Sequence, residues 1–505
     1  MKNAQRTSPA SPASARPSHK KIALRITHRT IAVIAGLSLI SGGAAGAATI
    51  ALTATTAAAE QAFAQNGTGG MQAGGGADTM NFDYSGTYTG AITADGEDVS
   101  STDETYTASE SDQNAALAQD GGNLALDGIL LQKSGDDTDG NRCNFYGVNS
   151  ILTAVGDGTT ATVSNSSLAA TSAGSNGIFA TDGAVVTVSD TSIDTTADNS
   201  RGLDATYGGS IVADNVDITT AGNHCAGIAT DRGGGTITAT SSTISTQGSG
   251  SPILYSTGDI EVEDLTGTAS GSQIAGMEGL NTIDIDSSTL TSTITGKTAS
   301  DPIANGAIIY QSTSGDAEST TGESATFNAT DSTLRSAIES GSMFYLTNTK
   351  ALVTLKNTNL DFDSSKAALL TATGNDSNNW GQAGSNGADV TLNAIEQTLE
   401  GNIVVDTISS VSLSLADGST WTGSTQIDEN QNAQETSESP ISVTVDSTSS
   451  WIVTDDCTVS NLTLQQGGSI VDASGKTVTI RAGGKTVVQG DSEITVTVTG
   501  TYTAE

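Results

Sequence analysis

Aromatic residues, prolines and cysteines are all scarce in this chain of 505 residues. Aromatic side chains make up 4% of it, and there are six prolines and three cysteines. An odd number of cysteines leaves at least one thiol free, and there is no C-x-x-C motif. These absences argue against a disulfide-stapled fold and against a cysteine-bound metal.

Positive charge is the next scarcity, and it is unevenly distributed. The chain holds 19 Lys and Arg against 56 Asp and Glu, and residues 1–64 contain seven of the basic and one of the acidic residues. From Gln65 onward the balance is therefore 12 minus 55, or −43. Such a surface repels nucleic acids, anionic lipids and polyanionic glycans such as polygalacturonate. It suits a soluble exported protein, or one that binds calcium or cationic partners.

The basic N-terminal part has the order of an export signal. Lys20, Lys21, Arg25 and Arg29 precede an uncharged stretch over residues 30–59, and small residues suited to signal peptidase follow at Ala57–Ala59 and Ala62–Ala64. Residues 1–64 are therefore predicted to be a cleaved signal peptide. The uncharged stretch is also long enough to remain as a membrane anchor, which is the alternative.

Apolar residues make up only 35% of the chain, which would suggest disorder if they were not periodic. One apolar position recurs about every 25 residues, and we number the other positions of the repeat from it. The positions seven and five residues before it are also apolar, and the position three residues before it carries a short polar side chain. The origin column is Leu168, Ile193, Ile218, Ile244, Leu290, Leu334 and Leu360; the column at −7 is Ala161, Val186, Ile211, Ile237, Ile283, Phe327 and Val353; the column at −5 is Val163, Val188, Ala213, Ala239, Ile285, Ala329 and Leu355; and the column at −3 is Asn165, Asp190, Asn215, Ser241, Ser287, Asp331 and Asn357.

This repeat predicts one coil of three strands every 20–26 residues. Apolar residues at −7 and −5 alternate with polar ones, as in a strand with one buried face. The short polar side chain at −3 favours a turn, and a third apolar column follows at Ile178, Leu203, Ile228 and Ile253. We therefore expect an all-β fold, a right-handed parallel β-helix forming a single elongated domain whose coils lie about 4.8 Å apart.

The same pattern sets the expected boundaries. Residues 65–79 form a flexible Gly-rich leader, residues 80–118 an N-terminal cap, residues 119–490 the β-helix and residues 491–505 a C-terminal end strand. Excursions from the coils are expected at Gly315–Glu323 and Gly374–Gly387. Loops on a rigid scaffold are where recognition usually occurs.

Several sequence segments resemble those of a known protein family. They are NFYGVNS at Asn144–Ser150, NSRGLDATYGGSI at Asn199–Ile211, ATDRGGGTITA at Ala229–Ala239, GSPILYSTGDI at Gly250–Ile260 and IIYQSTSGDA at Ile308–Ala317. Over about residues 80–480 the chain resembles the adhesin-like β-helical surface proteins of gut bacteria, within the pectin-lyase-like superfamily. Its architecture also resembles that of autotransporter passengers. The resemblance implies an extracellular or cell-surface role in adhesion or glycan binding, and it carries over no catalytic residue.

One polar patch spans two neighbouring coils. A step of 25 residues places Tyr207 beside Arg232 and Asp231 beside Thr206. The patch is either a ligand-binding or hydrolytic site, or a solvated polar face with an ion pair. Its candidate residues are Arg201, Asp204, Tyr207, His224, Asp231 and Arg232.

Calcium is the one cofactor that the sequence suggests. Asp137, Asp139 and Asn141 form a D-x-D-x-N series of oxygen ligands, which suits calcium. Arg142 stands where a calcium loop of the EF-hand type needs glycine. The alternative is an ordinary loop rich in Asp and Asn.

The few aromatic residues and the cysteines complete the set of candidates. Trp380, in the Gly374–Gly387 excursion, is the best candidate for an exposed platform that stacks on a sugar ring. Trp421 and Trp451 lie in strand-like sequence and are expected to be packed, and Tyr255 and Tyr310 are expected to form a structural ladder. Cys143 and Cys225 lie about three coils, or roughly 14 Å, apart, which is too far for a disulfide.

These observations predict a secreted or cell-surface protein without enzymatic activity that binds an extracellular glycan or a host or microbial surface protein. A polysaccharide lyase or glycoside hydrolase is the first alternative, and a structural component of the cell envelope is the second. No nucleic-acid partner is expected, and contact with a membrane is expected only through an uncleaved N-terminal segment.

Overall fold

The computed structural model describes residues 81–312, 324–376 and 380–504. The predicted signal peptide, the leader over residues 65–79 and the excursion Gly315–Glu323 lie outside the described residues. Residues 72–505 belong to one compact unit. In the described part, the single helix α3 (Gly140–Tyr146) is too short to cross a lipid bilayer.

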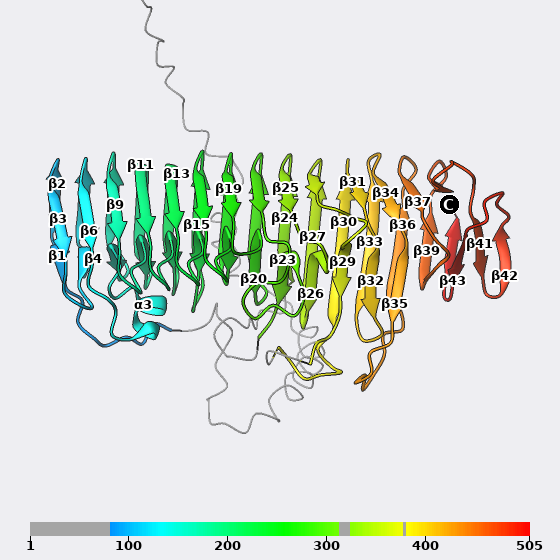
Figure 1. Ribbon diagram of the computed structural model, residues 1–505, viewed down its shortest axis with the longest axis horizontal. Helices are drawn as coiled ribbons and strands as arrows, with labels where there is room; N and C mark the ends of the chain where they lie inside the picture. Colours follow the sequence, from blue (N-terminus) through cyan, green and yellow to red (C-terminus); the bar gives the residue numbers. More distant parts are fainter. Residues whose placement is uncertain (1–80, 313–323, 377–379, 505) are drawn as a thin grey trace, which may run out of the picture. The chain divides into compact units, whose positions relative to one another are not determined.

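Three columns of short strands run through this unit, and most coils contribute one strand to each column (Figure 1). The first column, sheet A, consists of β1 (Gly90–Asp95), β4 (Asn114–Gln119), β7 (Leu152–Val155), β10 (Ile178–Thr181), β12 (Leu203–Ala205), β14 (Ile228–Thr230), β17 (Leu254–Ser256), β20 (Ala275–Glu278), β23 (Asn305–Tyr310), β26 (Ser342–Thr347), β29 (Ala368–Ala372), β32 (Ile403–Asp406) and β35 (Thr425–Asp428).

The second column contains β2 (Asp98–Thr102), β5 (Asn123–Asp127), β8 (Thr160–Ser164), the first halves of β11 (Val185–Thr195) and β13 (Gly209–Thr220), β15 (Gly235–Thr240), β18 (Asp259–Glu263), β21 (Thr282–Asp286), β24 (Ala325–Thr330), β27 (Thr349–Lys356), β30 (Ala388–Ile395), β33 (Ser410–Ala416), β36 (Ile441–Val445), β39 (Asn461–Leu464) and β44 (Tyr502–Ala504).

The third column contains β3 (Thr105–Ala108), β6 (Leu130–Lys133), β9 (Ser167–Ala170), the second halves of β11 and β13, β16 (Thr243–Thr246), β19 (Thr266–Ala269), β22 (Thr289–Ser292), β25 (Thr333–Ser336) and β28 (Asn359–Asp361). A separate sheet follows with β31 (Thr398–Glu400), β34 (Thr420–Gly423), β37 (Ser450–Val453) and β40 (Ser469–Asp472). The final sheet contains β38 (Cys457–Val459), β41 (Thr479–Ala482), β42 (Lys485–Val488) and β43 (Thr495–Val498).

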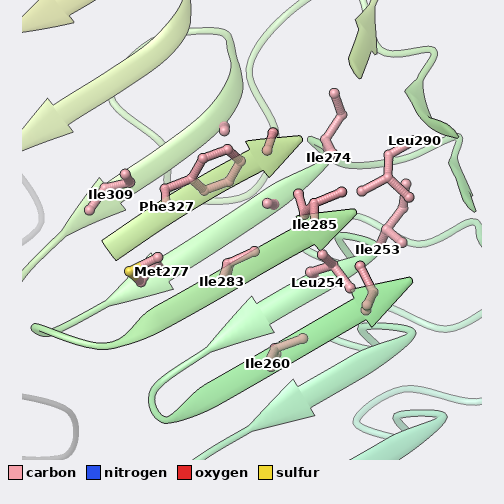
Figure 2. Close-up of a cluster of buried hydrophobic side chains, with 14 of the residues drawn as sticks. Ile253, Leu254, Ile260, Ile274, Met277, Ile283, Ile285, Leu290, Ile309 and Phe327 are labelled. Atoms are coloured by element: carbon pink, nitrogen blue, oxygen red, sulfur yellow. The ribbon is translucent and has the colours of Figure 1, made fainter. Parts of the chain in front are cut away.

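The strand pairing confirms the predicted parallel β-helix. Strands of successive coils pair in parallel, and β41 with β42 is the antiparallel exception among the paired strands described. The predicted columns are in register: Val163 pairs with Val188, and Val188 with Ala213. These side chains are buried, because one face of every strand turns inward. Figure 2 shows the same arrangement in later coils, where Ile260, Ile283 and Phe327 lie in the core.

Two parts of the predicted layout need correction. Ile228 pairs with Leu254 rather than with Ile253, because this coil is one residue longer than the previous ones. Both Ile253 and Leu254 are fully buried, which is why the apolar pattern did not distinguish them.

The ends of the β-helix also differ from the prediction. The first coil begins at Gly90, since β1 already pairs with β4, and so the coils extend into the segment predicted to be a cap. At the other end there are two strands instead of one: β43 pairs with β38 and β41, and β44 pairs with β39.

The polar column at −3 forms a corner between the second and third strand columns. Each of its residues adopts a left-handed backbone conformation, with φ of 51° at Asp190 and 54° at Asn215. Asn and Asp tolerate this conformation better than most residues with a side chain. Asn215 also donates from Nδ2 to Asp190 Oδ1 at 2.6 Å, so the corner side chains link neighbouring coils.

A buried hydroxyl follows this corner in many coils. The N–H of Ile129 donates to Ser166 Oγ at 3.0 Å, and the N–H of Val216 donates to Ser242 Oγ at 3.0 Å. Each hydroxyl satisfies a backbone donor that the turn takes out of the strand ladder. At another corner Cys225 takes the place of such a serine, since its Sγ lies 3.0 Å from the N–H of Ser200.

All three cysteines are free and buried, and Cys143 and Cys225 form no disulfide, as predicted. Burial raises the pKa of the Cys225 thiol to about 11 and that of Cys143 to about 12. Both thiols therefore stay protonated at neutral pH and are poor nucleophiles.

Substitution of Asn215 tests the corner. Asn215→Val should destabilise the protein by about 1–2 kcal/mol, since a β-branched residue fits the left-handed conformation poorly. Asn215→Gly should stay within about 1 kcal/mol of the wild type because glycine adopts that conformation freely. Urea unfolding followed by circular dichroism measures both, and Thr187→Val on an exposed strand position is the control. Equal effects of valine at positions 187 and 215 would contradict the role of the corner.

Candidate functional site

The outer face of sheet A carries the polar patch predicted from the sequence. Helix α3 lies over this face, held by side chains of the sheet below it. Thr206 Oγ1 donates to the carbonyl oxygen of Phe145 at 2.9 Å, and Asn176 Nδ2 donates to that of Cys143 at 3.0 Å. Asp139 caps the N-terminus of α3 and Gly147 its C-terminus. This helix was not predicted from the sequence.

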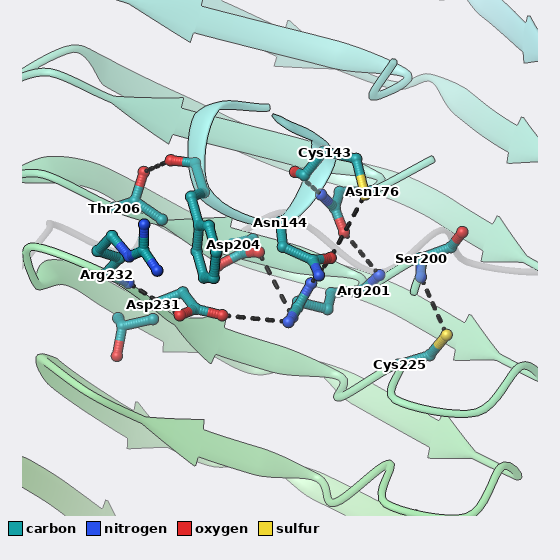
Figure 3. A network of polar contacts seen from close by, with 12 residues as sticks. Cys143, Asn144, Asn176, Ser200, Arg201, Asp204, Thr206, Cys225, Asp231 and Arg232 are labelled. Carbon is teal, nitrogen blue, oxygen red and sulfur yellow. Dashed lines mark hydrogen bonds and ion pairs between the residues drawn. The ribbon is translucent and has the colours of Figure 1, made fainter. Parts of the chain in front are cut away.

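Arg201 is the centre of a buried ionic network beneath α3 (Figure 3). Its Nη1 donates to Asn144 Oδ1 on α3 at 2.7 Å, and its Nη2 lies 3.1 Å from Asp231 Oδ2. Its Nε lies 3.5 Å from Asp204 Oδ2. Arg201 thus joins the helix to two coils of the sheet through one guanidinium group.

Asp204 is completely buried, and neither of its carboxyl oxygens has a hydrogen-bond partner in the described part of the chain. Burial raises the pKa of this carboxyl well above its usual range, although Arg201 acts in the opposite direction. A ligand cannot reach Asp204 while α3 is in place. The sequence suggested either a solvated polar face or a ligand site. Asp204 fits neither description in this structure, because it is buried under α3.

Tyr207 and Arg232 border this network, as the 25-residue register predicted. The N–H of Tyr207 donates to the carbonyl oxygen of Arg232 at 3.1 Å. The Arg232 guanidinium lies 3.8 Å from the centroid of the Phe145 ring, which is a cation–π contact with α3. The ring of Tyr207 stacks on Tyr146, with centroids 5.6 Å apart.

Residues 82–88, just before the first coil, pack on the same aromatic group. Phe82 contacts both Tyr146 and Tyr207 edge to face, and Tyr84 stacks on Tyr146 at 5.0 Å. The hydroxyl of Tyr88 donates to the carbonyl oxygen of Tyr146 at 2.7 Å. The N-terminal segment therefore covers α3 from outside, several coils away from its own place in the stack.

His224 has a different role from the rest of the predicted patch. It is exposed, and its φ of 56° places it in a left-handed corner between Asn199 and Gly250 of the adjacent coils. It borders a shallow depression together with Asp198, Asn223, Ser249, Ala299 and Ser300. Histidine is one of the residues that tolerate this backbone conformation, so His224 serves as a turn residue.

The residues predicted as calcium ligands lie at the start of helix α3. The Asp139 carboxylate accepts from the N–H of Asn141 at 3.0 Å and is occupied as the helix cap. Among the residues that the structure describes, no group of three or more His, Cys, Asp or Glu side chains converges as metal ligands. The D-x-D-x-N series thus leads into helix α3, with Asp139 as its N-cap.

A second aromatic group lies farther along sheet A. Trp380 stacks on Tyr310 with ring centroids 4.0 Å apart and is only 7% exposed. The prediction that Trp380 is an open platform is wrong, because the ring packs against Ile308, Tyr310 and Tyr345. Trp421 and Trp451 are buried as expected and stack at 4.8 Å.

Tyr255 and Tyr310 do not occupy one column, as a stacked ladder would require: the register aligns Tyr255 with Gly276 and Ile308, two residues before Tyr310. Their hydroxyls meet instead at Glu278, which was not recognised from the sequence. The hydroxyl of Tyr255 donates to Glu278 Oε2 at 2.6 Å, and that of Tyr310 donates to the same oxygen at 3.0 Å. Burial, followed by the nearby Glu278 carboxylate, raises the pKa of both phenols well above the usual range. Both hydroxyls therefore stay protonated as donors. The alternation of outward positions along β17, β20 and β23 was the signal that could have revealed this trio.

Comparison with known proteins adds one structural likeness. No family model and no curated protein matches the chain. Among solved structures, a chain in the cryo-EM structure of the Vag8–C1 inhibitor complex matches with a TM-score of 0.33 and 12% identity, covering 82% of this chain and 100% of that chain. The fold rests on the strand pairing of the protein itself, which is that of a parallel β-helix.

Replacing Arg201 tests the network beneath α3. Arg201→Met removes the cation that faces two buried carboxyl groups, which should cost about 3–5 kcal/mol in the free energy of unfolding. Arg335 forms a matched exposed pair with Asp361 at 2.6 Å, so Arg335→Met should cost at most about 1 kcal/mol. Urea unfolding of both variants makes the comparison. Similar losses in the two variants would contradict a special role for Arg201.

The raised pKa of Asp204 predicts a pH dependence. An acid whose pKa is raised by folding stabilises the folded state fully below the unfolded pKa of about 4, and this contribution is lost as the pH rises through the folded pKa. The stability of Asp204→Asn relative to the wild type should therefore increase as the pH rises from about 4 towards 8. Unfolding curves across this range, with Asp361→Asn as control, provide the measurement. A difference that does not change with pH would show that Asp204 is ionised throughout.

Proposed function

We propose that this is a secreted or cell-surface β-helix protein, without enzymatic activity, that binds an extracellular glycan or a host or microbial surface protein through the outer face of sheet A. One observation carries the proposal: in a chain with 4% aromatic residues, most aromatic side chains that are not part of the main core pack on this face or on segments that lie against it. They are Phe82, Tyr84, Tyr88, Phe145, Tyr146, Phe179, Tyr207, Tyr255, Tyr310, Tyr345 and Trp380.

Several features support a binding role for this face. Tyr146, Tyr255 and Tyr310 are partly exposed and combine an apolar ring with a polar hydroxyl, which suits contact with sugars and with protein surfaces. The segments that leave the coils also meet here, since Trp380 packs on Tyr310 and Asn430 donates to Asp406 at 2.7 Å. Loops on a rigid scaffold provide the variation that recognition needs.

Other features support the proposed extracellular or cell-surface location and the proposed lack of enzymatic activity. The basic and then uncharged order of residues 1–64 is that of an export signal, and the resemblance to adhesin-like surface proteins of gut bacteria agrees with it. Asp204 and Asp231, the carboxylates considered for hydrolysis, are buried and face Arg201. The acidic surface disfavours polyanionic ligands.

Binding assays on protein purified from the culture medium test the proposal. The protein should bind a subset of a panel of neutral and amino-sugar glycans, mucin and surface proteins, and Tyr310→Ala should weaken this binding by about tenfold, the loss of about 1.4 kcal/mol. Tyr502→Ala, at the C-terminal end of the β-helix, is the control. Absence of binding across the panel, or glycan products shortened or unsaturated by the protein, would contradict the proposal.

A further inference from the structure

The outer face of sheet A carries a column of hydrogen-bond acceptors over three adjacent coils. The register of β14, β17 and β20 places Asp231, Thr257 and Glu278 one after another, followed by Tyr310 on β23. Successive members lie about 4.8 Å apart along the stack. Asp231 and Glu278 are 8% and 9% exposed, so both carboxyl groups lie at the edge of the protein interior.

Glu278 is held by neutral donors only. Its partners are the hydroxyls of Tyr255 and Tyr310, and within the described part of the chain it forms no ion pair. A largely buried carboxylate gains most from a positively charged partner. The two partly exposed rings beside it add the attraction of aromatic faces for cations.

Thr257 supplies a second, independent observation. It is 1% exposed, and its Oγ1 has no hydrogen-bond partner in the described residues. Buried hydroxyls in proteins are normally paired, because an unpaired one costs free energy. Thr257 lies between Asp231 and Glu278, so a group that donates several hydrogen bonds there would satisfy it.

We propose that Thr257 and Glu278 form a subsite for the protonated amine of an amino sugar, with Tyr255 against the sugar ring. This inference rests on the proposed function. An ammonium group donates three hydrogen bonds, and its positive charge would pair with the Glu278 carboxylate. A neutral hydroxyl offers no charge, and an anion is repelled by Glu278.

The amine is assigned to a sugar in preference to a lysine side chain. An amino sugar carries its amine directly on a rigid ring, whose apolar face can lie on Tyr255. A lysine side chain would lose the freedom of several rotatable bonds on binding, at a cost of up to about 2 kcal/mol.

Calorimetry at slightly acidic pH with three probes tests the subsite: a fully deacetylated glucosamine tetrasaccharide, its fully N-acetylated counterpart and a lysine-containing tetrapeptide. The deacetylated sugar should bind at least about tenfold more tightly than either other probe. Glu278→Gln should remove this preference by about tenfold. Glu263→Gln, which removes an exposed carboxylate from β18, should retain it. An equal loss in both variants would mean general attraction to an acidic protein and would overturn the proposal.

Thr257→Val separates a ligand contact from a structural role. The variant should bind the deacetylated sugar about tenfold more weakly, yet its urea midpoint should not fall, because the hydroxyl has no protein partner to lose. A lower midpoint, or unchanged affinity, would overturn the subsite. Glycan binding without preference for the free amine would overturn this inference and leave the proposed function standing. No binding of any glycan or surface protein would overturn both.

Discussion

The corners between strands are the constraint on which the rest of this structure depends. A strand that stacks on its counterpart in the next coil satisfies its backbone groups without help, whereas a turn removes donors from that ladder. Here a left-handed residue makes the turn, and a buried side chain such as Ser166 or Ser242 accepts the freed N–H of the neighbouring coil. Because these bonds join adjacent coils at fixed positions, the corners set the register that aligns the outward side chains of sheet A.

This register explains why polar groups distant in sequence meet on one face. Arg201, Asp231 and Tyr207 come together because their coils are in step, and Asn144 joins them because α3 lies across the sheet. Two regions of this face differ in whether their carboxyl groups have a cationic partner. The region under α3 contains its own cation, Arg201, while Glu278 has only neutral hydroxyl donors among the described residues. The first is internally balanced and stabilising, and the second is suited to a partner.

The sequence predicted the repeating parts of the fold and lost accuracy where the repeat is interrupted. Val163, Val188 and Ala213 were placed correctly because they occupy equivalent positions in three successive coils. Helix α3 was missed because its seven residues are too few for an apolar period, although Asp139 and Gly147 are typical caps. Because the helix was not predicted, Asp139 was not recognised as its cap, and Asp137 and Asp139 were interpreted as calcium ligands.

Burial at the candidate site was equally hard to predict, since it depends on contacts between distant segments. Nothing local to Asp204 indicates that α3 covers it, and nothing local to Trp380 indicates that it packs on Tyr310. Tyr255 and Tyr310 were expected in one column, but they lie two positions out of register and are linked by Glu278, which was not recognised. Patterns within one coil predict which way a side chain points, but not what lies over it.

Leu290 and Leu334 stay in register although 44 residues separate them, as do Ser288 and Ser332 at the neighbouring corner. The added residues leave the strands above and below undisturbed, and the entropy of closing a longer loop rises only slowly with its length. Such a scaffold can gain, lose or exchange surface segments over evolutionary time while its interior stays the same. Related chains would then differ mainly in their excursions, and a change of binding preference would need no new fold.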